Sequence, residues 1–481
     1  LMLKEEEIMK KSKSLIIGLI LILFTCCSAF GLSNANSRNI TAENKIMAVE
    51  NTLPTIALSV TEQISPTPTL EPSPTVTIAP TPTPLPTPTK APKPKPTAPI
   101  VPAKKELLGG VKFLSAGMPI SVYNNEYSPE KVDVDGEYAE TDVDLNRFYR
   151  YSEIEAIILK LGLSTNVEVF KIGTTADSRN IYSLEIGTGA EKHLFVAGVH
   201  ALEVCNPLYI LKYAAWIVNL SQSNNEEVIN LLKTKRICIV VVVNPDGFDA
   251  AIWGNSTITN RSLFIAKYSD SELSMLKSNA NGVNLNRNFP SYSGGVIYTK
   301  QYRNIEFTKS PGLVSFTGYT LGVEPETQAM IKWYKHNLPD AKTFVDLHSR
   351  GRILYAGKLH LSDQLNSSCQ SLAKIAKGYT SYGVISASLE VPGKNESGTN
   401  TDFANEFVSG FVFNEELGRL VPPESDIYTL VKKYTKVKYS CKTISFETLA
   451  ELITATKNPE LQSSEWNGRR LQEAFFAICK T

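Results

Sequence analysis

The sequence predicts an α/β domain, built on a mixed and mainly parallel twisted sheet with helices on both faces. After residue 145, short apolar runs rich in β-branched residues alternate with longer segments of helical periodicity. This alternation favours parallel strands joined by helices. Residues 106–481 are long enough to form one large domain with a substantial core, and we expect a single domain there.

Individual elements follow from the same periodicity. Four apolar runs are predicted as buried strands, at 193–197, 237–243, 343–346 and 443–446. The run from Val240 to Val243 is β-branched throughout, which favours a central strand. Helices are predicted at 151–161, 207–219, 325–337, 364–377 and 465–478. Ser152 and Glu155 have the spacing of a capping box at the start of the first helix.

The first 29 residues have the pattern of a signal peptide. Lysines at 10, 11 and 13 precede an apolar run at 15–24, and small residues at 27 and 29 suit cleavage after residue 29. This run is shorter than the roughly 20 residues of a transmembrane helix, although an uncleaved anchor is the alternative. We expect synthesis to start at Met9, because the Lys-Glu-rich stretch before it would have purine-rich codons like a ribosome-binding site. Export to a bacterial extracellular or cell-surface setting is predicted.

A spacer is predicted between the signal peptide and the folded domain. Residues 30–65 form a short low-complexity segment, and residues 66–104 form a Pro/Thr-rich linker. From Pro66 to Pro102, 14 of 37 residues are proline, a density that excludes helix and sheet and favours extended polyproline II. We interpret the linker as a spacer rather than a ligand motif. Its lysines would attract an anionic cell wall weakly, so the segment is expected to act as a cell-wall or membrane tether.

Charge and cysteine content exclude other classes. The formal net charge is only +1 and the charges are interspersed, so no nucleic-acid partner is expected. Two of the seven cysteines lie in the targeting segment, and the five in the body are Cys205, Cys238, Cys369, Cys441 and Cys479. None has metal-ligand spacing, and five thiols allow at most two disulfides. The chain is expected to act as a monomer.

Two side chains that suit zinc follow the first predicted strand. His200 and Glu203 lie three residues apart, and a short turn would bring the imidazole and the carboxylate to one point. A catalytic zinc site usually takes three protein ligands, and two histidines with a glutamate are a standard set. Among the other histidines, His193 begins a strand and His336 falls on a predicted helix surface. His348 ends a strand, as His200 nearly does, and is therefore the predicted third ligand.

Two further motifs lie between these candidate ligands. Residues 244–248 read NPDGF, a strand end followed by a proline-glycine turn. Residues 282–290 read GVNLNRNFP, which places Arg287 between Asn286 and Asn288 in a buried-looking turn. An arginine in such a setting favours the binding of an anion, because its guanidinium pairs with a carboxylate through two hydrogen bonds.

With these motifs, the chain resembles the zinc carboxypeptidase family, typified by the pancreatic carboxypeptidases and the bacterial γ-glutamyl peptidases. The match runs from about Tyr151 to the C-terminus and keeps the order of the motifs RYSE, Ser178-Arg179, GVHALE, NPDGF, GVNLNRNFP, EPET and DLHS, then a glutamate-bearing strand. The resemblance implies a zinc carboxypeptidase-like fold, one Zn²⁺ per chain and recognition of a substrate carboxylate. The residues it implies are His200, Glu203 and His348 for zinc, and Asn286 and Arg287 for the carboxylate.

Three positions depart from the family pattern. Asn284 stands where the family usually has an aspartate that accepts a hydrogen bond from the first zinc histidine. Arg350 replaces the tyrosine expected two residues after the third ligand. The arginine that polarises the scissile carbonyl has no clear counterpart: Lys277 is the best positional match, and Arg261 is the alternative.

Two segments offer a candidate general base. Glu447 ends an apolar run that precedes the last predicted helix, where the family has its catalytic strand, and we favour it. The alternatives, Glu415 and Glu416, lie among polar turn residues and suit a solvated loop. A long insertion at 420–440 separates the two segments, and Tyr428 within it is our candidate for the mobile tyrosine that closes over substrate.

Together with the predicted signal peptide, the resemblance implies a secreted zinc metallocarboxypeptidase. Glu447 would take a proton from a zinc-activated water and return it to the leaving amine, while zinc and Lys277 stabilise the oxyanion. Arg287 would restrict cleavage to the chain end. Two alternatives remain: a cell-wall stem-peptide (γ-D-glutamyl) peptidase or zinc amidase on the same fold, and a non-catalytic peptide-binding module. The substrate is thus a peptide or a cell-wall peptide.

Overall fold

The computed structural model describes residues 111–113, 117–292, 296–298, 310–358, 361–386, 398–423, 436–449, 451–458 and 460–481. These ranges all fall within the compact unit Pro92–Thr481. The signal peptide, low-complexity segment and linker predicted for residues 1–104 lie outside them. Within the described ranges, no helix combines the length and the apolar character that crossing a membrane requires.

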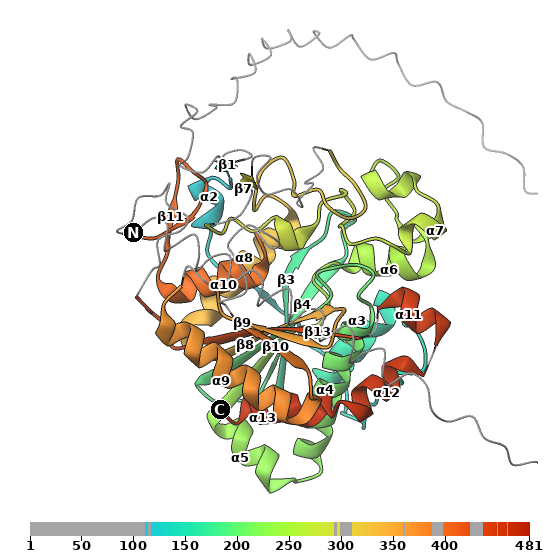
Figure 1. Cartoon of the computed structure of the whole chain (residues 1–481). Coiled ribbons are helices and arrows are strands. Elements are labelled where there is room, and N and C mark those ends of the chain that lie inside the picture. Colours follow the sequence, from blue (N-terminus) through green and yellow to red (C-terminus); the bar gives the residue numbers. More distant parts are fainter. Residues whose placement is uncertain are drawn as a thin grey trace, which may run out of the picture. The chain divides into compact units, whose positions relative to one another are not determined.

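A large mixed sheet forms the centre of this unit (Figure 1). Its central strands β13, β8, β5 and β6 are parallel, β4, β3 and β2 continue it in antiparallel pairing, and β9 runs antiparallel to β13. The mixed sheet predicted from the sequence is thus confirmed, with the parallel pairs at its middle. In spatial order the strands are β10 (Gly383–Ser386), β9 (Ile353–Ala356), β13 (Lys442–Thr448), β8 (Ala341–Ser349), β5 (Glu191–Val196), β6 (Lys235–Val240), β4 (Asn180–Ile186), β3 (Val167–Thr174) and β2 (Glu130–Lys131).

Helices cover both faces of the sheet (Figure 1). Phe195 of β5 and Phe344 of β8 point to opposite faces, as the register of these strands requires. Phe195 meets Tyr213 of one helical layer, whereas Phe344 meets Tyr334 of the other. The first layer holds α4 (Cys205–Gln222), α9 (Asp363–Thr380) and α13 (Leu471–Cys479), and the second holds α8 (Pro325–Asn337) and α10 (Asn400–Ser409).

Shorter elements complete the described fold. Two further sheets each pair two strands, β1 (Val111–Phe113) with β7 (Val296–Tyr298) and β11 (Val412–Asn414) with β12 (Arg419–Val421). The remaining α-helices are α2 (Ile120–Tyr123), α3 (Tyr151–Leu161), α5 (Glu226–Thr234), α6 (Pro245–Trp253), α7 (Asp270–Leu273), α11 (Leu452–Lys457) and α12 (Leu461–Gly468). Short 3₁₀ helices are η1 (Asn255–Thr257), η2 (Phe264–Lys267), η3 (Leu285–Arg287) and η4 (Leu338–Asp340).

Three local predictions were wrong. The strand expected at 237–243 ends at Val240, and the three valines that follow are buried in a loop, where Val243 N–H donates to the carbonyl of Ala197 just after β5. The helix expected at 465–478 is two helices, because α12 ends at Gly468, a poor helix former, and Arg470 has a left-handed backbone conformation. Helix α3 begins one residue earlier than its predicted cap, since the Glu153 side chain accepts the backbone N–H of Arg150 at 2.7 Å.

The body cysteines form no disulfide among the described residues. Cys205, Cys238, Cys369, Cys441 and Cys479 are all buried free thiols. They act as small core side chains.

A carboxylate pair at the start of α8 holds the loop that leads into the GVNLNRNFP motif. Glu324 and Glu326 both accept hydrogen bonds from the side-chain amide of Asn279, at 2.7 and 3.0 Å. Glu326 is fully buried, and its second oxygen has no partner among the described residues. Burial, with the charges of Asp246 and Glu324, raises the pKa of Glu326 to about 8. Glu326 is therefore expected to be protonated in the folded chain at neutral pH.

Replacement of Glu326 by Gln should make the protein more stable than wild type at pH 8 and close to wild type at pH 5. The ordinary pKa of this carboxyl is 4.5, and a higher value in the folded chain makes stability fall as pH rises from 4.5 to about 8. Glutamine mimics the protonated carboxyl and removes that loss, which is roughly a few kcal/mol. Thermal unfolding of both proteins across this range measures the effect. Parallel stability curves would show that Glu326 titrates normally.

Candidate metal centre

The candidate ligands lie where two parallel strands end. β5 and β8 are neighbours, and their carboxyl ends meet at one edge of the sheet, where open α/β sheets bind ligands. His348 is the next-to-last residue of β8. After β5 the chain turns at Gly198, which has φ of +66° and would bring a Cβ atom to 3.0 Å from the Val242 backbone. This turn carries the chain to His200 and Glu203.

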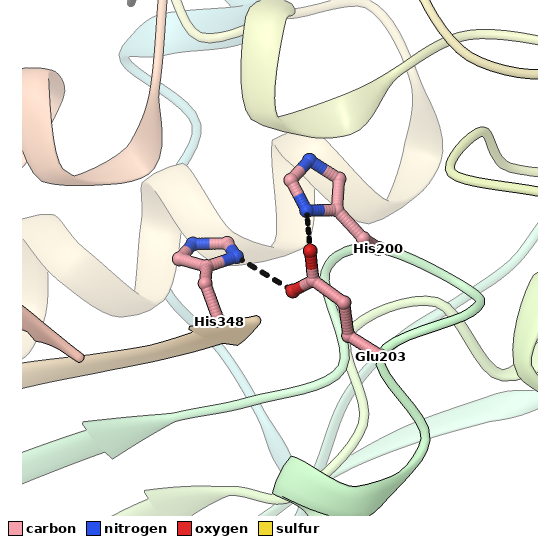
Figure 2. A group of neighbouring side chains, drawn as sticks. All are labelled: His200, Glu203 and His348. Carbon is pink, nitrogen blue, oxygen red and sulfur yellow. Dashed lines mark hydrogen bonds and ion pairs between the residues drawn. The ribbon is translucent and has the colours of Figure 1, made fainter. Parts of the chain in front are cut away.

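The three side chains form one compact, buried group (Figure 2). The carboxylate of Glu203 lies between the two imidazoles: its Oε1 is 2.7 Å from Nδ1 of His200, and its Oε2 is 3.0 Å from Nδ1 of His348. Potential ligand atoms of the three residues lie within 4.8 Å of one another. Their exposed fractions are 7%, 1% and 3%, so bulk water does not compete for these atoms.

The charge state of the group is set by burial and by its own members. Burial lowers the pKa of His200 to about 4, although Glu203 opposes this effect. Burial alone would raise the pKa of Glu203, but the two histidines outweigh it and hold that pKa well below its usual value. His200 is therefore neutral and Glu203 ionised at neutral pH. These are the forms that bind a metal ion.

Asp346 orients the second imidazole and was missed by the sequence analysis. Its Oδ2 lies 2.9 Å from Nε2 of His348, so that nitrogen donates its proton to the carboxylate and Nδ1 is left to face Glu203. Asn400 and Thr401 of α10 donate to the two carboxylate oxygens, at 2.9 and 2.8 Å. The signal was present in the motif DLHS, because residues two apart on a strand point to the same face.

Burial and charge at His348 fit this arrangement. Burial would lower the pKa of His348, but the carboxylates of Asp346 and Glu203 outweigh burial and hold the pKa well above its usual value. A cation at the centre is thus favoured electrostatically. A metal ion that binds Nδ1 would displace a proton from this imidazole.

Asn286 and Arg287 lie in η3, beside the same imidazole. The amide nitrogen of Asn286 is 3.2 Å from Nε2 of His348, and its oxygen accepts the backbone N–H of Asn400 at 3.0 Å. Arg287 is half-buried and donates to the carbonyl of Asn286 at 2.7 Å. No described carboxylate forms an ion pair with Arg287, which leaves its guanidinium suited to a ligand anion.

Lys277 lies at the centre, whereas its alternative does not. The Lys277 Nζ is 3.8 Å from Oε1 of Glu203, and its side chain is one-third exposed. Arg261 is exposed and donates to the carbonyl of Asn255. Arg350 lies at the rim, with its side chain 60% exposed and its Nε 3.5 Å from the buried carboxylate of Glu451. Of the two cations considered from the sequence, Lys277 is the one beside a candidate ligand.

The donor set fits zinc. Two imidazoles and a carboxylate are a standard catalytic zinc set, and both Nδ1 atoms face the carboxylate. With Nδ1 of His200 on a metal, Nε2 would carry the proton, and this buried atom has no partner among the described residues. Oδ1 of Asn284, at the position where the family has an aspartate acceptor, also has no partner among the described residues, so Asn284 and His200 form no such hydrogen bond. Asn284 instead donates to the Val314 carbonyl at 2.7 Å.

Glu447 lies beside the candidate ligands on a neighbouring strand. In the parallel pairing of β13 with β8, Glu447 is the partner of His348, so both side chains point to the same face of the sheet. Both line one pocket, together with Asn286. Glu415 and Glu416 are exposed in the turn between β11 and β12, as expected for a solvated loop.

The remaining candidates lie elsewhere or outside the described residues. Tyr428, the candidate mobile tyrosine, is not among the described residues. His193 is buried, with Nδ1 2.9 Å from the Thr343 hydroxyl, and His336 packs against Tyr127. His360 is also outside the described ranges.

Comparison with known proteins identifies the family. A family model described as zinc carboxypeptidase matches residues 158–435, more than half of the chain. The chain belongs to the zinc carboxypeptidase family. The predicted resemblance is confirmed, and His200, Glu203 and His348 form a group that could hold the metal ion expected in a zinc-dependent family.

The relatives include carboxypeptidases and a γ-D-glutamyl-L-diamino acid endopeptidase. The chain is 25% identical to the human carboxypeptidase N catalytic chain over 199 residues, which cover 39% of each protein. It is 26% identical over 196 residues to γ-D-glutamyl-L-diamino acid endopeptidase 1 of Lysinibacillus sphaericus, covering 39% of this chain and 46% of that protein. A solved structure of bovine thrombin-activatable fibrinolysis inhibitor with tick carboxypeptidase inhibitor is 19% identical, with a TM-score of 0.46, covering 70% of this chain and 99% of that one. The matched part thus spans less than half the length of each of these two curated relatives.

Proposed function

We propose that this protein is an exported zinc metallocarboxypeptidase that removes residues from the C-terminus of peptides. One observation carries the proposal: Glu447 lies opposite His348 on the neighbouring strand, beside a buried group of two imidazoles and a carboxylate. A metal site with an adjacent carboxylate that is not a member of the group has the parts needed for hydrolysis. The proposed zinc ligands are His200, Glu203 and His348.

The side chains around His200, Glu203 and His348 have separate roles in the proposed reaction. A bound zinc ion would supply a Lewis acid that acidifies a water molecule and polarises the scissile carbonyl. Glu447 accepts the proton of the attacking water and later gives it to the amine nitrogen as the C–N bond breaks. Lys277 contributes positive charge where the carbonyl oxygen becomes negative. Asp346 keeps His348 in the tautomer that leaves Nδ1 for the metal.

Arg287 determines which peptide bond of the substrate is cleaved. Its half-buried guanidinium would bind the terminal carboxylate of the peptide, while Asn286, in contact with His348, borders the pocket that receives the last residue. A peptide without a free carboxylate would leave this cation unpaired. We therefore infer an exopeptidase.

The proposal predicts zinc-dependent release of C-terminal residues. A purified full chain should contain about one zinc ion, should release the last residue from peptides with a free carboxylate, and should lose this activity with a chelator and regain it with zinc. Each peptide is compared with its C-terminally amidated form, which should react at least about tenfold more slowly because a charge-assisted bond to Arg287 is lost. Amino-acid analysis measures release. A protein that binds no zinc would contradict the proposal.

A second candidate function is cleavage of cell-wall peptides. It is favoured by the similarity to a γ-D-glutamyl-L-diamino acid endopeptidase and by the predicted export. Zinc without release from ordinary peptides, but with cleavage of γ-D-glutamyl peptides, would select this function. Equal cleavage of free and amidated peptides would also move the assignment from exopeptidase to endopeptidase or amidase.

A further inference from the structure

A lysine lines the pocket next to the candidate metal centre. The pocket is lined by His348, Glu447 and Asn286, and also by Lys358. The Lys358 side chain is only 8% exposed. Large buried cations are rare in proteins unless they are paired or bind a ligand. The proposed chemistry uses no cation at this position.

The backbone of Lys358 is fixed by its neighbours. Its N–H donates to the side-chain oxygen of Asn366 at 2.9 Å, and its carbonyl accepts from the Asn366 amide at 3.0 Å. Gly357 before it has φ of +82°, and a Cβ atom there would come within 2.2 Å of the same Asn366 oxygen. These constraints set the direction from which the lysine side chain enters the pocket.

Carboxylates lie around the ammonium group of Lys358. Asp402 of α10 lies 3.2 Å from Nζ of Lys358 and also accepts the backbone N–H of Thr399 at 3.2 Å. Two carboxylates line the pocket itself: Asp346, which is engaged by His348 and by Asn400, and Glu447, the proposed general base. Asp402 is thus a partner of the Lys358 ammonium.

The end of α10 adds to the positive potential. Thr399 and Thr401, at the N-terminus of this ten-residue helix, line the same pocket. The N-terminal end of a helix carries partial positive charge and favours anions. Beside its two carboxylates, the pocket therefore presents an ammonium and a helix N-terminus to a bound group.

We propose that Lys358 makes this pocket select peptides whose C-terminal residue has an acidic side chain. The inference rests on the proposed function, because the pocket must receive the side chain of the residue that is released. A carboxylate of that residue would share the ammonium with Asp402, whereas a lysine or arginine side chain would meet like charge. The terminal α-carboxylate is left to Arg287, so the preferred substrate ends in a residue with two carboxylates.

The test compares peptides that differ only in their last residue, using the full zinc-loaded chain. For wild type, kcat/KM should be roughly 10- to 100-fold higher for a peptide ending in Glu than for the same peptide ending in the isosteric Gln, the range expected for a charge-assisted hydrogen bond. Peptides ending in Leu and Lys complete the panel. In Lys358→Met the Glu/Gln ratio should fall to about one or below, whereas Lys358→Arg should keep it.

Matched variants separate recognition from structural damage. Lys358→Met leaves Asp402 without this ion pair, so the double variant Lys358→Met/Asp402→Asn removes both charges and should give a ratio near one with a wild-type unfolding temperature. Asp402→Asn alone keeps the ammonium and should raise the ratio. A Glu/Gln ratio of one in wild type, or a ratio that Lys358→Met leaves unchanged while the Leu peptide is still cleaved, overturns the inference and leaves the proposed function intact. Failure to release any residue from any peptide would instead refute both.

Discussion

Replacement of Glu447 by Gln is expected to lower the rate of peptide hydrolysis by roughly a hundred- to ten-thousandfold, the usual contribution of a general base, without loss of the metal. Glutamine keeps the shape of the side chain but cannot accept a proton from water. Because Glu447 is the register partner of His348 and not a member of the His200, Glu203 and His348 group, zinc content should remain at wild-type level. Saturating kcat and metal analysis on the same preparations measure the two quantities.

The matched control is Glu416→Gln, a change in the exposed turn between β11 and β12. It should leave both kcat and zinc content unchanged. If Glu447→Gln kept wild-type kcat, the base would have to be another group. A variant that lost both zinc and activity would show that Glu447 supports the metal group rather than acting on water.

The sequence predicted the metal group because its residues occupy special places in a parallel sheet. His200 follows β5 and His348 ends β8, and strand ends of this kind converge whatever the details of packing. Glu447 could be favoured over Glu416 for the same reason, since the first ends a buried strand and the second lies in a polar turn. Sheet topology thus carries the information that local motifs alone lack.

Other features depend on tertiary contacts that periodicity does not encode. Val241 to Val243 form a buried loop, and an apolar run cannot by itself distinguish a strand from any other buried segment. Asp346 and Asn400 meet from elements more than fifty residues apart, and Lys358 reaches the pocket because Asn366 fixes its backbone. These side chains had no motif of their own. Their roles follow only from the tertiary structure, which brings them to the same pocket.

Replacement of His348 by Gln should remove zinc from the isolated protein and abolish hydrolysis. Glutamine is not a usual zinc ligand. Loss of the His348 imidazole therefore leaves two donors where a catalytic zinc site needs three. Asp346→Asn provides a graded comparison, because it keeps all three donors but supplies no negative charge at Nε2, and metal affinity should fall roughly 10- to 100-fold. Competition with a chromophoric chelator measures both variants.

The control for the loss of any buried histidine is His193→Gln. His193 is as buried as His348 and lies on the adjacent strand, where it pairs with Thr343 of β8 in both register and hydrogen bonding. Burial lowers the pKa of His193 to about 3, so it is neutral, and its replacement should affect stability but not zinc affinity. If His193→Gln lost zinc as completely as His348→Gln, the loss would reflect damage to the sheet. If only His348→Gln did so, the end of β8 would hold the metal, and the weaker effect of Asp346→Asn would measure what the orienting carboxylate adds.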